Sequence, residues 1–277
     1  MISFLPPNEK VPVFPEDSLI MRIALIRGNE LRHKYLSISL SMANNDFIDL
    51  VDLSAVQSRK KIYESSEFRQ HFSLLMGTEL KLLGPLIDAQ EKLLRPKLIP
   101  SPDSLLSREI LDGFSPDVIV TFGCSIIPST LISHFEGKFL GIHLGLSPYY
   151  RGSGSNFWPF YFDEISCVGF TIMNIDSGID TGAVIHQARV VLDKSDDLHS
   201  AGVKCSIQMT DFVVKVCNEW PQRGVPINLK QGRYLKRSDF NVSAINAVEQ
   251  KINGGSIAKY LELKRDIDLK FPIITLR

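Results

Sequence analysis

A histidine stands where a short apolar stretch gives way to a turn, in KFLGIHLGLSPYYRG at residues 138–152. His143 ends the apolar run, and Gly, Pro, Tyr and Arg follow it in place of further core residues. Histidine is the side chain whose unperturbed charge changes near neutral pH, so His143 is a candidate for handling protons. The alternative is an ordinary histidine that is hydrogen-bonded within the core or a turn.

A second polar segment, IDSGIDTG at residues 175–182, follows further along the chain. It carries two carboxylates, Asp176 and Asp180, among glycines. Such a segment is either a functional loop or an acidic turn between two strands. The D-x-D-x-D-G order of an EF-hand is absent, so we do not expect a calcium loop.

The composition predicts a compact, soluble and electrically neutral protein. Hydrophobic residues make up 44% of the 277 residues, which is enough for a sizeable core. Lys plus Arg and Asp plus Glu number 31 each, so no net field attracts nucleic acid or an anionic membrane. The four cysteines have no C-x-x-C spacing, which argues against a zinc or redox motif and favours a reducing, cytoplasmic location.

The N-terminus does not have the pattern of a targeting segment. Residues 1–20 contain four prolines and acidic residues in place of a basic stretch and an apolar core. No segment of the chain reaches the roughly 18 apolar residues of a membrane span. We therefore expect residues 1–20 to form an arm laid over the surface, with the fold starting near Met21.

Strands and helices alternate from residue 21 onward, which predicts an α/β fold with a doubly wound, mostly parallel sheet. The expected strands are the apolar runs 21–26, 47–53, 96–100 (an edge run), 115–123 and 138–144, and the expected helices are 30–43, one or two within 55–95, 101–114 and 127–135. In such sheets ligands bind beyond the carboxyl ends of the strands, where His143 and the turn after Phe122 both fall.

The pattern changes after residue 160. Segments 167–175 and 183–192 flank the polar segment IDSGIDTG, which we call the acidic loop, and they predict an antiparallel pair of strands. Residues 197–220 predict a helix. Residues 225–277 predict a small α+β tail with a hairpin-like piece at 232–240 and two short helices.

A family resemblance rests on two stretches, PDVIVTFGCSIIPSTLISHFEGKFLGIHLGLSPYYRG and VGFTIMNIDSGIDTGAVIHQARV. They resemble the folate-dependent formyltransferases, which include glycinamide ribonucleotide, methionyl-tRNA and sugar-nucleotide N-formyltransferases. The resemblance is close over residues 115–192 and weak over the opening RIALIRGNELRH. It implies a Rossmann-like formyltransferase fold, with a catalytic domain over 21–224 and a small extension over 225–277.

The resemblance places His143 and Asp180 at the catalytic positions. In this family an amine attacks the formyl carbon of 10-formyltetrahydrofolate, which creates an oxyanion and an ammonium that must lose a proton. A positive imidazole and an amide N–H stabilise the oxyanion, and such preorganised donors contribute about 3 kcal/mol each. The neighbouring carboxylate would raise the pKa of the histidine and help to relay the proton.

One position departs from the family pattern. Gly141 stands where the motif has an asparagine, two residues before the histidine. Glycine has no side-chain amide, so another group must supply the donor. The sequence offers the backbone N–H of Gly141, a water molecule, or the side chain of Asn156 or Asn174.

The resemblance also implies where the folate would bind. The loop after the central strand and the acidic loop would hold the pterin, largely through backbone groups, at Ser125, Ile126, Ile127, Asp176 and Gly178. Both isoleucines fit a plain core role equally well, and Asp176 also fits the role of a turn former.

The acceptor side has weaker signals. IRGNE resembles a phosphate loop at a helix start but has a single glycine, so Arg27, Asn29 and Arg32 either hold an anionic acceptor or form a solvated helix start. Tyr150 and Arg151 belong to an aromatic and basic group that either stacks on a base or sugar or packs in the core. The charged run 55–95 is either a solvated helical face or a lid over the acceptor.

We therefore expect an N-formyltransferase that acts on a small amine, such as an amino sugar attached to a nucleotide. Two alternatives remain: a protein of this fold that binds folate or another metabolite without transfer, and a 10-formyltetrahydrofolate hydrolase in which water replaces the amine. We expect no tRNA acceptor, because residues 225–277 are too short for a tRNA-binding domain. Self-association as a homodimer stays open.

Overall fold

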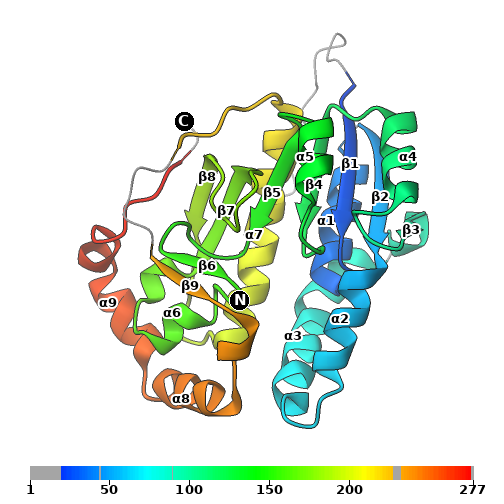
Figure 1. Cartoon of the computed structure of the whole chain (residues 1–277). Coiled ribbons are helices and arrows are strands. Elements are labelled where there is room, and N and C mark those ends of the chain that lie inside the picture. The colour runs from blue at the N-terminus through cyan, green and yellow to red at the C-terminus, as the bar shows by residue number, and fades with distance from the viewer. Residues whose placement is uncertain (1–19, 44, 89, 227–231, 276–277) are drawn as a thin grey trace, which may run out of the picture.

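Figure 1 shows the computed structural model of the chain, which describes residues 20–43, 45–88, 90–226 and 232–275. The arm expected over residues 1–20 therefore lies outside the described residues, apart from Ile20 at its end. Within the described ranges, no helix is long and apolar enough to cross a lipid bilayer. The four cysteines are all free thiols.

A seven-stranded sheet forms the centre of the molecule, in the order β3-β2-β1-β4-β5-β7-β8. Its parallel part comprises β1 (Arg22–Arg27), β2 (Asp46–Asp52), β3 (Lys97–Ile99), β4 (Val118–Phe122) and β5 (Phe139–His143). Its antiparallel part comprises β7 (Gly169–Asn174) and β8 (Val184–Arg189). The mostly parallel sheet predicted from the sequence is thus confirmed, with β3 at its edge.

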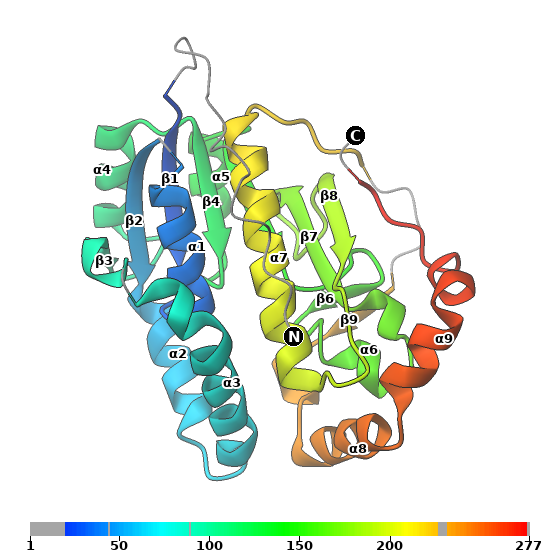
Figure 2. The same cartoon turned by 180° about the vertical axis from the view of Figure 1, so that it is seen from behind.

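Helices cover both faces of this sheet (Figures 1 and 2). One face carries α1 (Leu31–Ser41) and α7 (Leu198–Asn218), and the other carries α4 (Leu105–Phe114) and α5 (Ser129–His134). Successive residues of β1 alternate between these two layers, because side chains of a strand point to opposite faces. Ile23 and Leu25 join the core under α1 and α7, whereas Ala24 and Ile26 join the core under α4 and α5.

Two helices extend past the carboxyl ends of β1 and β2, as Figure 1 shows. These are α2 (Leu53–Tyr63) and α3 (Arg69–Ile87), and η1 (Glu91–Leu93) follows them. The Asp52 carboxylate starts α2 by accepting from the backbone N–H of Ser54 and Ala55. Helix α3 buries Leu83 and Ile87, so the charged run at residues 55–95 is not exposed to solvent along its whole length.

A second, two-stranded sheet lies beyond β5 and joins distant segments. In it β6 (Tyr150–Gly152) pairs in parallel with β9 (Arg233–Leu235). The hairpin predicted at 232–240 is therefore wrong, and residues 237–239 form the 3-10 turn η3 (Arg237–Asp239). The backbone of residues 149–152, which follows the end of β5, needs hydrogen-bond partners, and β9 provides them.

The remaining elements pack beside this small sheet. They are α6 (Trp158–Tyr161), η2 (Ile165–Cys167), α8 (Val242–Asn253) and α9 (Ser256–Asp268). The buried residues of α8 and α9 belong to the same hydrophobic core as those of α7, so residues from both sides of position 225 share one core.

Candidate active site

His143 ends β5 at the carboxyl edge of the sheet, with an oxygen atom facing each ring nitrogen. Its Nδ1 lies 3.2 Å from Asp180 Oδ1 and its Nε2 lies 3.1 Å from the Tyr150 carbonyl oxygen. A carboxylate and a carbonyl can only accept hydrogen bonds, so both nitrogens carry a proton in this arrangement. The geometry therefore holds a positively charged imidazolium beside a carboxylate.

The electrostatics of the pair agree with this assignment. Burial alone would lower the pKa of His143, but the charge and hydrogen bond of Asp180 outweigh burial and raise it. Burial would likewise raise the pKa of Asp180, yet His143 and the Gly152 N–H lower it overall. Each partner thus favours the charged form of the other.

Asp180 reaches His143 because the acidic loop bends back over the end of β5. Its φ is 53°, in the left-handed region that Asp tolerates better than most residues. Its Oδ2 also accepts from the Gly152 N–H at 2.8 Å, which links the loop to β6. Asp176 shapes the same loop by accepting from the Gly178 N–H and the Thr181 hydroxyl, at 2.9 and 2.8 Å.

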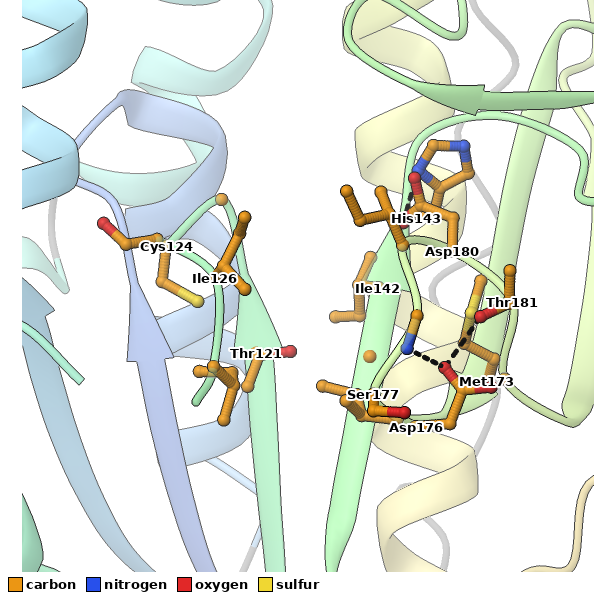
Figure 3. A pocket seen from close by; sticks show the side chains of 18 residues that line it. Thr121, Cys124, Ile126, Ile142, His143, Met173, Asp176, Ser177, Asp180 and Thr181 are labelled. Carbon is orange, nitrogen blue, oxygen red and sulfur yellow. Dashed lines mark hydrogen bonds and ion pairs between the residues drawn. The ribbon is translucent and has the colours of Figure 1, made fainter. Parts of the chain in front are cut away.

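A cavity of about 220 Å³ opens between this loop and the loop after β4, and we call it the loop cavity (Figure 3). Its lining includes all eight of the expected catalytic and folate-binding residues: Gly141, His143, Ser125, Ile126, Ile127, Asp176, Gly178 and Asp180. The structure therefore brings together in one cavity residues that lie far apart in the sequence.

The β4 loop that forms one wall is held by Asp52. The Asp52 Oδ2 accepts from the Ser125 N–H at 2.7 Å, and the Ser125 hydroxyl lies 2.7 Å from that of Ser54. The two isoleucines differ: Ile127 is buried in the core, whereas Ile126 is 80% exposed. A plain core role therefore fits Ile127 but not Ile126, which offers an apolar surface to a ligand.

Gly141 forms part of the cavity floor, and neither asparagine considered as a substitute donor lines this cavity. The Asn156 Oδ1 accepts from the Gly169 N–H and its Nδ2 donates to Cys205 Sγ. The Asn174 Oδ1 accepts from the Gly224 N–H. A Cβ at position 141 would lie 2.9 Å from Ile175 Cγ1, so Ile175 fills the space of a larger side chain.

A second cavity of about 350 Å³ lies on the other side of His143, and we call it the helix cavity because α2, α3 and α7 contribute to its walls. Its polar lining includes Arg32, Arg59, Glu79, Ser155 and Asn156. Three residues line both cavities: Gly123, Ile142 and His143. His143 therefore stands at the junction of the two cavities.

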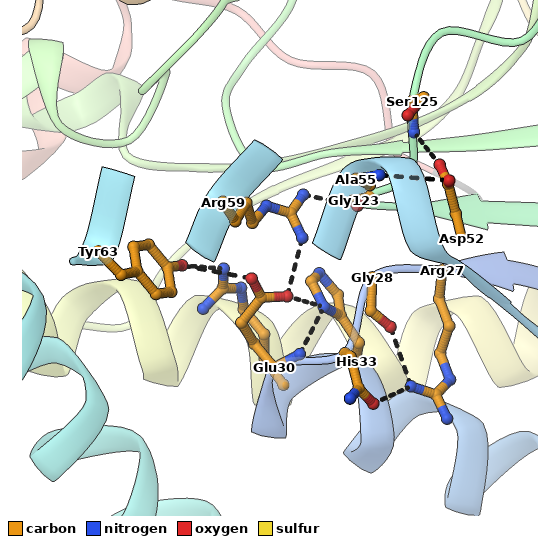
Figure 4. A network of polar contacts seen from close by, with 12 residues as sticks. Arg27, Gly28, Glu30, His33, Asp52, Ala55, Arg59, Tyr63, Gly123 and Ser125 are labelled. Carbon is orange, nitrogen blue, oxygen red and sulfur yellow. Dashed lines mark hydrogen bonds and ion pairs between the residues drawn. The ribbon is translucent and has the colours of Figure 1, made fainter. Parts of the chain in front are cut away.

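The charges of the helix cavity compensate one another within a buried network (Figure 4). The Glu30 Oε2 lies 2.6 Å from His33 Nδ1 and 2.8 Å from Arg59 Nη1. Arg32 forms an ion pair with Glu79. Burial outweighs Glu30 and lowers the pKa of His33 to about 3, so this imidazole is neutral near pH 7.

Sequence reasoning missed Glu30, His33 and Arg59. The one local signal was the spacing of Glu30 and His33, three residues apart at a helix start, where the two side chains are neighbours. Arg59 comes from α2 and gave no local signal. Arg32 was noted as a candidate, and its role here is an ion pair in the wall of the helix cavity.

Three expected acceptor-binding residues have structural roles instead. Arg27 is 1% exposed, and its Nε and Nη2 each donate to an Asp49 oxygen at 2.7 Å. Asn29 receives a 3.4 Å hydrogen bond from Arg27, and neither residue lines the two cavities. Tyr150 is fully buried and its hydroxyl donates to Glu164. Because Arg27 is already neutralised, the expectation that it holds an anion is corrected.

Arg151 connects the acidic loop to the small sheet. Its Nη1 lies 3.5 Å from the Ile179 carbonyl oxygen, and its guanidinium lies 5.7 Å from the centre of the Tyr234 ring. This position steadies the loop that carries Asp180. Arg151 lines neither the loop cavity nor the helix cavity.

Replacing Gly123 with alanine is expected to lower the free energy of unfolding by about 1–3 kcal/mol. Gly123 has a φ of 63°, and an added Cβ would lie 2.2 Å from His33 Nε2. Urea denaturation measures the effect, with Gly113→Ala as the control, because nothing lies within 4 Å of a Cβ at that helical position. Equal stability of the two variants would contradict the crowding at Gly123.

Solved structures share this fold. A sugar N-formyltransferase from Shewanella sp. superposes with a TM-score of 0.55 at 15% identity, over 84% of this chain and 87% of the other. A phosphoribosylglycinamide formyltransferase from Anaplasma phagocytophilum superposes with a TM-score of 0.51 at 15% identity, over 78% of this chain and 99% of the other. These likenesses establish the formyltransferase fold.

Sequence comparison matches part of the chain to formyltransferases. Residues 89–216 match the formyl transferase family model, so the chain carries a formyl transferase domain. A methionyl-tRNA formyltransferase from Finegoldia magna is 30% identical over 115 residues, which are 40% of this chain and 36% of that protein. Matches to two further methionyl-tRNA formyltransferases cover 42% and 50% of those proteins. The chain therefore spans about a third to a half of the length of these relatives.

Proposed function

We propose that this chain transfers a formyl group from 10-formyltetrahydrofolate to a small amine. The observation that carries the proposal is the position of the His143 and Asp180 pair, with His143 lining both cavities. A transfer between two substrates needs the reacting groups to meet at one catalytic centre. The formyl transferase domain and the formyltransferases among its relatives support this reaction class.

The loop cavity suits the formyl donor. It has a flat apolar contact in exposed Ile126, and backbone groups of the β4 loop and the acidic loop surround it. Its volume of about 220 Å³ suits a bicyclic pterin better than a whole folate, whose tail would extend outward. The formyl carbon would then lie near His143.

The helix cavity suits the amine. Its two arginines are already paired with Glu30 and Glu79, so little uncompensated charge faces the ligand. Phe157 and Val203 add apolar contacts, and Ser155, Ser206 and Asn156 add polar ones. This lining suits a small, largely neutral part of the acceptor around its amine, and α3 forms one wall of the site.

The chemistry follows from the charge on His143. A C–N bond forms between the amine and the formyl carbon, and the bond from that carbon to folate N10 breaks. Negative charge develops on the formyl oxygen, and the imidazolium stabilises it at short range in a water-poor site. The amine gives up one proton and N10 gains one, and the His143 and Asp180 pair is placed to pass it.

Calorimetric titration with 5-formyltetrahydrofolate, a stable folate analogue, tests the donor site first. We expect micromolar binding that Asp180→Ala weakens, because the acidic loop would lose its link to β6. His134→Ala serves as the control, since this histidine lies on α5 and lines neither cavity. Absence of detectable binding to the wild-type chain would reject the folate proposal.

A formyl transfer assay then tests the acceptor. The amines to compare are an amino sugar nucleotide, phosphoribosylglycinamide and methionyl-tRNA, the acceptors implied by the names of the relatives. We expect turnover with a small amine and little formate when no amine is present. Formate release without amine would instead identify a hydrolase.

A further inference from the structure

The cavity floor beside His143 raises a specific question about the proposed reaction, on which this inference rests. Gly141 has no side chain, and the space above it is occupied by Ile175. Neither Asn156 nor Asn174 lines the loop cavity. Besides the Gly141 backbone N–H and solvent, the candidates for a second donor to the formyl oxygen are the other side chains that line the loop cavity.

Thr121 lies directly beside Gly141 on the neighbouring strand. The register of β4 and β5 pairs Thr121 with Gly141, so both residues present the same face of the sheet. Thr121 lines the loop cavity and is 5% exposed. In Figure 3 its hydroxyl oxygen points toward the neighbouring strand, which carries Ile142 and His143.

The Thr121 hydroxyl is also weakly engaged. Its hydrogen bond to the Leu140 carbonyl oxygen is 3.4 Å long, at the outer limit for an O–H donor. Two other hydroxyls of the cavity wall differ: Ser125 shares a 2.7 Å contact with Ser54, and Thr181 donates to Asp176 at 2.8 Å. Thr121 can thus exchange its partner for a ligand at small cost.

We propose that the Thr121 hydroxyl donates a hydrogen bond to the formyl oxygen and acts as the second oxyanion donor beside His143. In this assignment the donor lies on β4, at the position paired with Gly141 of β5. Thr121 is a catalytic residue in this assignment because it contacts the reacting carbonyl.

The test compares Thr121→Val, which keeps the shape, with Thr121→Ser, which keeps the hydroxyl. We expect Thr121→Val to lower kcat by about 100-fold with little change in KM for either substrate, because the hydrogen bond strengthens in the transition state. Thr121→Ser is expected to stay within about tenfold of wild type, since the hydroxyl that donates to the oxyanion is retained. Thermal melting of both variants checks that the fold is kept.

A second readout does not depend on turnover. Infrared difference spectra of a stable 10-formyl folate analogue with a ¹³C-labelled formyl group report hydrogen bonding to its carbonyl. We expect a downshifted carbonyl band in wild type and Thr121→Ser that moves back up in Thr121→Val.

The outcomes separate this inference from the proposed function. If wild type transfers formyl groups while Thr121→Val keeps the kcat and the downshifted carbonyl band of wild type, only the role of Thr121 is overturned. If Thr121→Ser is as slow as Thr121→Val, the residue acts through packing and the inference also fails. If wild type neither binds the folate analogue nor transfers formyl groups, the proposed function fails and this inference fails with it.

Discussion

Replacing His143 with glutamine is expected to lower kcat for formyl transfer by about 10³-fold or more, because both charge stabilisation and proton transfer are lost. Glutamine can still donate toward the Tyr150 carbonyl oxygen, which His143 Nε2 approaches at 3.1 Å, so the turn after β5 should persist. What disappears is the positive charge at the junction of the two cavities.

Steady-state kinetics with 10-formyltetrahydrofolate and the best amine of the transfer assay measure this loss. His134→Gln is the matched control, because His134 pairs with Asp112, lines neither cavity and should not affect turnover. A His143→Gln enzyme within tenfold of wild type would show that the imidazolium is not the catalytic group.

Replacing Asp180 with asparagine is expected to slow transfer by about 100- to 1,000-fold near neutral pH and to shift its pH profile. Asparagine tolerates the left-handed backbone of this position, whose φ is 53°, so strain is kept to a minimum. The loss then reports on charge and not on a distorted loop.

The direction of the pH shift follows from the balance at His143. In wild type, Asp180 overcomes burial and raises the pKa of His143, so the imidazolium and the rate persist until the pH rises through that raised value. Without the carboxylate, burial dominates and lowers the pKa of His143. The alkaline fall in kcat should therefore move to lower pH.

Titration of the His143 ring by NMR checks the shift independently of activity. The same pair contributes to folding stability within a window: Asp180, with its lowered pKa, loses its contribution as the pH falls through that value. His143, with its raised pKa, loses its contribution as the pH rises through that value. An unchanged His143 pKa in Asp180→Asn would contradict the coupling.

The sequence predicted those parts of the fold that depend on local pattern. Apolar runs gave the strands and placed His143 at the end of β5, and a repeated strand-helix order gave the parallel sheet. The antiparallel pair around the acidic loop followed from the same local alternation. The family resemblance paired Asp180 with His143, and the structure places Asp180 Oδ1 and His143 Nδ1 3.2 Å apart.

Contacts between distant segments could not be predicted in this way. Nothing in IRGNE shows that Arg27 is neutralised by Asp49 from the next strand. Thr121 looks like an ordinary β-branched residue of a buried strand, and only the register with Gly141 sets it apart. Arg59 reaches the helix cavity from α2 because the β4 loop accepts its hydrogen bond at the Gly123 carbonyl.

The pairing of β6 with β9 bears on the order in which the site is assembled in a growing chain. Residues 150–152 leave the ribosome well before residues 233–235, their only strand partners in the described structure. The Gly152 N–H that holds Asp180 belongs to β6, so its position depends on a strand made later. A nascent chain can thus complete the large sheet early, whereas the catalytic pair is fixed only after residues 233–235 have been made.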